Sequence, residues 1–249
     1  MNFVKQKTER LQHVDLSRKG SVDEALHEVV NLINSLPMYF TTSSCSGRTI
    51  LVENLEKKVQ KKGCKWLYVS HDPVVETDIE NALKELIGEA VLKFEPMVMH
   101  IQCQALDDAQ RMHQAAVAAG FRNSGITVGL KGKIMIAVRS THSLEAPLSD
   151  EGKILVSQEY LKYLTVSANG KMQENFARIH RFHENVKLFV KQLSISSSVE
   201  VDCRKKRKNP AKVKKAEANK DVDIPINCTD NNTFNSDGDM SLFLFDTPS

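Results

Sequence analysis

The spacing of apolar positions predicts helices alternating with strands over most of the chain. Apolar residues recur every three or four positions in four segments, which predicts helices near 21–36, 77–87, 106–119 and 158–193. Ser21 and Glu24 have the spacing of a capping box at the start of the first helix, and Pro37 ends it. Asn169-Gly170 predicts a break in the last helix.

Short runs rich in β-branched and aromatic residues predict the strands. They lie at 38–42, 49–52, 65–70, 90–95, 97–103, 126–129, 133–139 and 154–156. The small polar stretch 43–48 is expected to be a turn between two of them, and Pro96 to separate two others. Since several strands follow one another directly, the pattern favours an α+β fold, with a mixed β-sheet packed with helices and a long C-terminal helix.

Composition excludes several classes of protein. The 249 residues are 41% hydrophobic and 26% charged, as in an ordinary globular chain, and no run approaches the ~20 apolar residues of a membrane span. The N-terminus lacks the apolar core of a signal peptide. Five cysteines, none in C-x-x-C spacing, argue against a zinc ribbon and a disulfide framework. We therefore expect no metal site, no membrane partner and a reducing, cytoplasmic location.

Charge is unevenly distributed along the chain, whose net charge is +3. The stretch 204–220 carries nine Lys or Arg and one acid, and the sequence beyond it is acidic and rich in Asn. We expect a folded body over 1–199 and a disordered tail over 200–249. The basic run Arg204–Lys208 is compatible with nuclear import, although such runs are usually solvated tails.

Glycine motifs for nucleotide binding are absent from the sequence. It contains no G-x-G-x-x-G after a strand, no G-x-G at all, and no G-K-[ST] phosphate loop. The expected α+β fold is therefore of a non-Rossmann type.

The polar stretch 43–48 is the first candidate for chemistry. Its backbone N–H groups and hydroxyls, with the guanidinium of Arg48, suit a carboxylate or phosphate; the alternative is a hairpin that uses small residues for steric reasons. Cys45 could be a nucleophile activated by His71 or His100, but a lone cysteine is more often a small buried hydrophobe. The candidate binding residues here are Ser44, Cys45, Ser46, Gly47 and Arg48.

The second candidate is the polar sequence that follows the third predicted helix. Phe121 could stack on a base while Arg122 and Asn123 hold phosphate or base edges. The alternative is a solvated left-handed turn. Lys93 and Glu95 share one side of a predicted strand, where they could pair with each other or Glu95 could be catalytic. The further candidate binding residues are Lys93, Ser124, Gly125 and Arg139.

Five words in fixed order support a family resemblance: DLSRKGSVD, TTSSCSGR, LKFEP, GFRNSGITVG and AVRSTH. Together they resemble the wybutosine-synthesis methyltransferase family of tRNA modification, over about Asp15–Lys191. The resemblance implies an α+β fold distinct from Rossmann methyltransferases. It implies transfer of a methyl group from S-adenosylmethionine to N4 of 7-(3-amino-3-carboxypropyl)-4-demethylwyosine, at the purine 3′ to the anticodon of phenylalanine tRNA. Other wybutosine-pathway enzymes are the further partners it implies.

The resemblance also suggests roles for the candidates. The 43–48 stretch would hold the donor's carboxylate or a tRNA phosphate, and residues 121–124 would seat the base or the donor's adenine. Asp15, Glu95 or His100 would accept the proton, with Asp15 favoured by its polar surroundings. The two polar bends are expected to share one pocket. Two alternatives remain open: a non-catalytic tRNA-binding module and a Cys45-dependent hydrolase.

Overall fold

The computed structural model describes residues 2–12, 21–54 and 64–207. Asp15 lies outside the described residues, as does everything after Arg207. The chain divides into two compact units, Met1–Arg204 and Lys205–Ser249, and the first contains the fold discussed below. In the described part, no helix is long and apolar enough to cross a membrane.

A six-stranded antiparallel sheet forms the centre of the first unit. Its path is β2-β1-β3-β5-β4, and β6 pairs with β3 beside β5. A two-stranded ribbon of β7 and β8 completes the strands. The expected α+β fold is confirmed, with a sheet that is antiparallel rather than mixed. The strands are β1 Tyr39–Asn54, β2 Cys64–Ser70, β3 Glu89–Cys103, β4 Gly125–Val128, β5 Ile134–Val138, β6 Leu144–Pro147, β7 Ser149–Asp150 and β8 Lys153–Ile154.

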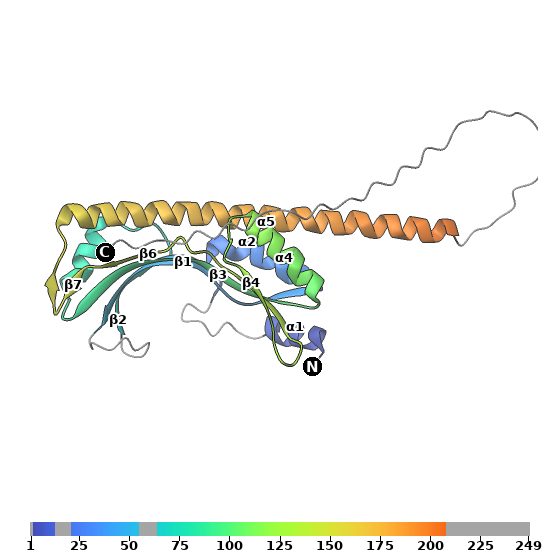
Figure 1. Cartoon of the computed structure of the whole chain (residues 1–249), viewed down its shortest axis with the longest axis horizontal. Coiled ribbons are helices and arrows are strands. Elements are labelled where there is room, and N and C mark those ends of the chain that lie inside the picture. Colours follow the sequence, from blue (N-terminus) through green and yellow to red (C-terminus); the bar gives the residue numbers. More distant parts are fainter. Residues whose placement is uncertain (1, 13–20, 55–63, 208–249) are drawn as a thin grey trace, which may run out of the picture. The chain divides into compact units, whose positions relative to one another are not determined.

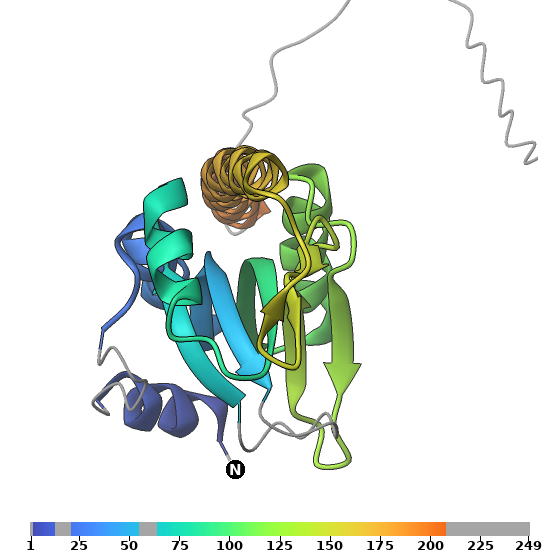
Figure 2. The same cartoon turned by 90° about the vertical axis from the view of Figure 1, so that its left-hand side faces the viewer.

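Most helices cover one face of the arched sheet. Figure 1 shows α2, α4 and α5 on that face and α1 on the opposite side, and Figure 2 shows α3 on the same side as α5. Met97, Met99 and Ile101 of β3 are fully buried beneath α2, α4 and α5. The helices are α1 Phe3–Gln12, α2 His27–Ser35 after a 3-10 turn at Glu24–Leu26, α3 Glu76–Leu83, α4 Leu106–Ala118 and α5 Gln158–Arg207.

Helix α5 is continuous, so the predicted break at Asn169-Gly170 is wrong. A glycine in a helix costs about 1 kcal/mol, and burial of the apolar stripe of α5 outweighs that cost. Asn169 does not end the helix, because its side chain donates to the Val74 carbonyl and accepts from the Val74 N–H, both at 2.8 Å. The helix also runs to Arg207, beyond the expected end of the folded body at residue 199.

Strands β1 and β3 are each continuous, which corrects two further predictions. The stretch 43–48 is part of β1 rather than a turn, and it pairs with β3 in a register that places Gly47 opposite Pro96. Pro96 does not interrupt β3 because it falls in a gap: β6 pairs with β3 up to Phe94, and β5 pairs with it from Met99. A residue without an N–H is tolerated where a strand has no second neighbour.

Candidate functional site

The middle of β1 lacks a strand neighbour on one side. Strand β2 pairs with β1 only from Thr49 to Asn54, which leaves the polar backbone groups of residues 43–48 without β2 as a partner. Two side chains take its place. The carboxylate of Asp23 accepts a hydrogen bond from the Ser46 N–H at 2.8 Å, and Nδ1 of His71 lies 3.0 Å from the Gly47 carbonyl oxygen. Buried backbone groups need such partners, so the fold itself positions both side chains.

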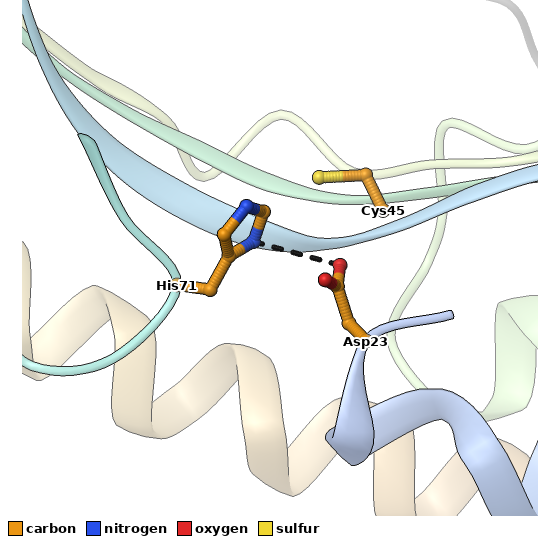
Figure 3. A group of neighbouring side chains, drawn as sticks. All are labelled: Asp23, Cys45 and His71. Atoms are coloured by element: carbon orange, nitrogen blue, oxygen red, sulfur yellow. Dashed lines mark ion pairs between the residues drawn. The ribbon is translucent and has the colours of Figure 1, made fainter. Parts of the chain in front are cut away.

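Asp23, Cys45 and His71 form a cluster that joins three separate segments (Figure 3). Asp23 precedes the 3-10 turn before α2, Cys45 lies in β1, and His71 directly follows β2. Nδ1 of His71 is 3.5 Å from a carboxylate oxygen of Asp23, and the thiol of Cys45 lies within 4.8 Å of both side chains. Asp23 is only 8% exposed, so its carboxylate acts from a largely buried position.

The surroundings of His71 determine which ring nitrogen carries the hydrogen in the neutral imidazole. Nδ1 faces the Gly47 carbonyl and the Asp23 carboxylate, which only accept hydrogen bonds, and the more distant Ser46 hydroxyl at 3.4 Å can accept as well. The hydrogen is therefore assigned to Nδ1, which leaves the lone pair of Nε2 available. A carboxylate that orients an imidazole in this way is a recurring arrangement for a general base.

Cys45 remains a neutral thiol in this setting. Burial raises the pKa of the Cys45 thiol, and the opposing effects of a backbone hydrogen bond to Gly47 and the charge of Arg48 are smaller. Because the thiolate is both the nucleophile and the metal-binding form of cysteine, a raised pKa opposes both uses. Three ligand atoms of the right types do lie close together here, but Asp23 and His71 already serve the backbone of β1.

Gly47 changes which residues of the two long strands face the helices. The fully buried residues of β3 are even-numbered up to Phe94 and odd-numbered from Met97 onward, so the alternation switches opposite Gly47. Gly47 has a φ of +100°, which L-residues with a Cβ rarely adopt. Through this switch, Cys45 and Arg48 lie on the face without the covering helices α2 to α5, although three positions separate them.

Asn175 of α5 stabilises the backbone at the same point. Its side-chain amide donates to the Ser46 carbonyl at 2.6 Å and accepts from the Met97 N–H at 2.8 Å. The residue is completely buried. A Cβ on Gly47 would lie 2.9 Å from the Asn175 amide nitrogen, so glycine also permits this close approach of helix and strand.

Arg48 is held by a carboxylate and an aromatic ring. Its Nε donates to the Glu95 carboxylate at 2.8 Å, and its guanidinium lies 4.7 Å from the ring centroid of Trp66. The register explains the pair, because Arg48 is directly opposite Glu95 and Glu145 is opposite Lys93. Lys93 and Glu95 were expected to share one side of a strand and could have paired with each other, but Lys93 instead pairs with Glu145 at 2.8 Å.

The other candidates in this part of the sheet divide between its two faces. His100 lies opposite Ser43, and their side chains are 3.0 Å apart. Ser44 lies opposite the fully buried Met99, and Ser46 is itself 1% exposed. The structure thus brings Cys45, Arg48, Glu95 and His100 to one face of the sheet, and turns Ser44 and Ser46 toward the helices.

The second predicted bend lies elsewhere. Arg122 and Asn123 line a cavity of about 510 Å³ between the end of α4 and α5, and none of residues 43–48 lines it. Phe121 is fully buried and packs edge-on against Phe182 with 6.0 Å between ring centroids, so the expectation that it stacks on a base is wrong. An aromatic side chain contributes more to this core than it could at the surface.

The remaining candidates form the turn itself. The Ser124 hydroxyl donates to the Phe121 carbonyl at 2.7 Å, and Arg139 Nε donates to the Asn123 carbonyl at 3.0 Å. Gly125 begins β4. The cavity observed at Asn123 is therefore not the shared pocket that was expected for the two bends.

Sequence reasoning missed three residues of this arrangement and underrated a fourth. Asp23 belongs to the motif DLSRKGSVD but was assigned no role of its own. His71 was considered only as an activator of Cys45. Trp66 and Asn175 carried no signal as members of a strand and a helix. Their contacts depend on which segments the fold brings together, and pattern along the chain does not contain that information.

Fold and site together define an α+β domain without the Rossmann glycine loop, in which a buried aspartate and a partly exposed histidine pair at the free edge of a strand. The family described as Methyltransferase TYW3 matches residues 5–188. The chain therefore belongs to this methyltransferase family.

Individual proteins agree with this assignment. A tRNA wybutosine-synthesizing protein 3 homolog of Xenopus laevis is 46% identical over 248 residues, covering 99% of this chain and 98% of that protein. The Mus musculus protein of the same name is 50% identical over 198 residues, covering 79% and 77%. Among solved structures, the PH1069 protein of Pyrococcus horikoshii is 31% identical with a TM-score of 0.69, covering 74% of this chain and 96% of that one.

Proposed function

We propose that this methyltransferase acts on tRNA in wybutosine synthesis, transferring a methyl group from S-adenosylmethionine to N4 of 7-(3-amino-3-carboxypropyl)-4-demethylwyosine in phenylalanine tRNA. The single observation that carries the proposal is the imidazole of His71, oriented through Nδ1 so that Nε2 can accept a proton. The names of the relatives support the tRNA substrate and the pathway.

Methylation of a nitrogen requires alignment and the removal of one proton. When bound, S-adenosylmethionine supplies a methyl carbon whose bond to a positively charged sulfur breaks as the acceptor nitrogen bonds to it. Positioning of two reactants can lower a barrier by about 7–11 kcal/mol, whereas one general base contributes about 10²–10⁴-fold. In the proposal, His71 Nε2 takes the proton from N4 and Asp23 stabilises the imidazolium that forms.

Among the described residues, His71 is better placed to accept the proton than Glu95 or His100. The Glu95 carboxylate is bound to Arg48, and the Ser43 hydroxyl beside His100 Nδ1 can donate or accept, so no acceptor-only group fixes the tautomer of that ring. Asp15 lies outside the described residues. Nε2 of His71 is the nitrogen left with a free lone pair after the backbone and Asp23 have used Nδ1.

The residues around Arg48 fit a donor of this chemistry. S-adenosylmethionine carries a carboxylate, positive charges and an adenine ring. Arg48 offers a guanidinium for the carboxylate, and Glu95, whose side chain is 45% exposed, offers a negative charge. Trp66 is 36% exposed and provides an aromatic surface on the same side of the sheet. These three side chains would hold the donor next to the Asp23–His71 pair.

The experiment is a methylation assay on phenylalanine tRNA from cells that lack this activity. Mass analysis of the modified purine is expected to show a product heavier by one methyl group with the wild-type protein. His71→Ala and Asp23→Asn are expected to give far less product in the same time while melting as cooperatively as the wild type. Full activity in His71→Ala would remove the imidazole from the proposal.

Calorimetry distinguishes the second candidate function, a tRNA-binding module without chemistry. The methyltransferase is expected to release heat on mixing with S-adenosylmethionine, and Arg48→Ala to weaken that binding. A protein that binds tRNA but gives no heat with the donor would favour the binding module.

A further inference from the structure

We propose that the arginine cavity, lined by residues 118–120, 122–123, 140–142, Glu174, Arg178 and Arg181, binds a phosphate group of the tRNA backbone, separately from the Asp23–His71 pair. The inference rests on the proposed tRNA substrate. It assigns a ligand chemistry to a second region of the molecule that takes no part in proton transfer.

The floor of the cavity is a fixed network built on helix α5. Arg178 donates to the Glu174 carboxylate at 2.8 Å and to the Ser140 hydroxyl at 2.9 Å. Arg181 also donates to Glu174, at 2.9 Å, and its Nε donates to the Ala119 carbonyl at 3.2 Å. Because two guanidiniums share one carboxylate, the floor keeps an excess positive charge.

Structural requirements explain part of this network. The last carbonyls of a helix have no partners within the helix, and Arg178 and Arg181 bind those of Gly120 and Ala119 at the end of α4. This capping accounts for both arginines, so their presence alone does not indicate a ligand.

Helix capping does not explain the polar side chains at the rim of the cavity. The guanidinium of Arg122, the amide of Asn123 and the hydroxyl of Thr141 are exposed and have no hydrogen-bond partner among the described residues. All three are donors that converge on a cavity whose ionised lining is three arginines and one glutamate. A group with several acceptor oxygens and a negative charge is the chemical match for this set.

A tRNA phosphate fits the cavity better than the carboxylate of the methyl donor. A cavity of about 510 Å³ has room for a phosphate together with its sugar, so the position of the cavity decides between the two ligands. None of the residues 43–48, which lie beside the Asp23–His71 pair, lines the cavity. Helix α5 contacts both regions, through Asn175 at Ser46 and through the neighbouring Glu174 in the cavity. A polynucleotide can contact both regions at once, since it extends well beyond its reacting base.

The test measures binding of unmodified phenylalanine tRNA at several salt concentrations with full-length protein. Arg122→Gln is expected to weaken binding about tenfold at low salt. It should also reduce the slope of log K against log salt by about 0.7–0.9, the loss of one phosphate contact. Arg122→Lys keeps the charge and should keep most of the slope. Lys84→Gln, in which the lost charge lies just beyond α3, is the matched control and should leave the slope unchanged.

Other outcomes would overturn the inference. If Arg122→Gln and the double variant Asn123→Ala/Thr141→Val bind tRNA with wild-type affinity and slope, the cavity holds no phosphate. If they instead lose affinity for S-adenosylmethionine while tRNA binding is unchanged, the cavity holds the carboxylate of the donor. Failure of the proposed function is separate, because a wild-type protein that binds tRNA with this salt dependence but transfers no methyl group would leave the phosphate site standing.

Discussion

In both the Asp23–His71 pair and the arginine cavity, side chains bind backbone groups that lack a partner in their own strand or helix. The first region uses an aspartate for this and the second uses arginines. In the first, side chains complete the free edge of β1, and in the second, side chains complete the last carbonyls of α4. Backbone carbonyls and N–H groups are present in every element, so a fold must supply partners wherever strands or helices end. The chemistry of the side chains that bind these backbone groups then determines which ligands or reactions the region can support.

The two regions differ in burial and in charge. Asp23 is 8% exposed and faces a single imidazole, an arrangement suited to moving one proton. The cavity is lined by three arginines and one glutamate, and three donors at its rim have no partner within the described part of the chain. Under our proposals the first region carries the chemistry and the second binds phosphate, and the following experiments test that division.

The largest expected effect is on the chemical step. His71→Ala should slow single-turnover methylation by about 10²–10⁴-fold, because a general base of this kind contributes that much. His180→Ala, which alters a histidine of α5 on the lining of another cavity, is the control and should stay within about twofold. A similar small change in His71→Ala would show that the proton leaves by another route.

Asn175→Leu should produce the largest loss of stability. The change leaves the Ser46 carbonyl and the Met97 N–H buried without partners, and each such group costs about 1–3 kcal/mol. We expect the free energy of unfolding to fall by about 2–5 kcal/mol, measured by urea denaturation. Asn81→Leu, at an exposed position of α3, should change it by less than about 0.5 kcal/mol.

Two glycine variants separate a required glycine from a tolerated one. Gly47→Ala should destabilise by about 2 kcal/mol or more, because φ is +100° and the new Cβ would lie 2.9–3.1 Å from three neighbouring atoms. Gly170→Ala meets no atom within 4 Å in α5 and should stabilise by up to about 1 kcal/mol. Equal melting temperatures for the two variants would contradict the conformational switch at Gly47.

The only tryptophan of the chain gives a direct signal from the donor site that we propose. Because Trp66 is 36% exposed and carries Arg48 over its ring, binding of S-adenosylmethionine should change its emission. Occupation of the arginine cavity by inorganic phosphate should leave the emission unchanged. An emission change with phosphate, or none with the donor at saturation, would contradict the separation of the two regions.

The smallest effect is a pH dependence in the arginine cavity. Burial, followed by the charge of Arg178, lowers the pKa of His142 below its ordinary 6.5. The unfolded chain therefore binds a proton more readily, so the stability that His142 contributes is present above about pH 6.5 and is lost as the pH falls. The decrease in Tm between about pH 7.5 and 5.5 should be smaller in His142→Gln than in the wild type. An equal decrease would show that His142 titrates normally.

The sequence by itself determined every helix except α1, most strands and the family motifs. Periodicity along the chain reports burial of one face, so the helix at 106–119 and the strand at 65–70 were predicted close to their observed bounds. The motifs TTSSCSGR and LKFEP were recognisable in the sequence, but the sequence did not show that they pair with each other. In the structure they are paired strands, with Arg48 opposite Glu95 and Gly47 opposite Pro96.

Only the tertiary structure decided what those residues do. Pro96 and the small residues at 43–48 look like strand breakers along the chain, but gaps in the neighbouring strands leave room for them within one long strand pair. Phe121 looked available because its neighbours are polar, yet it is buried against Phe182. His71 gained its orientation from Asp23 and Gly47, which are distant in the sequence. Local pattern reflects local preference, whereas a hydrogen bond between distant segments exists only after the chain has folded.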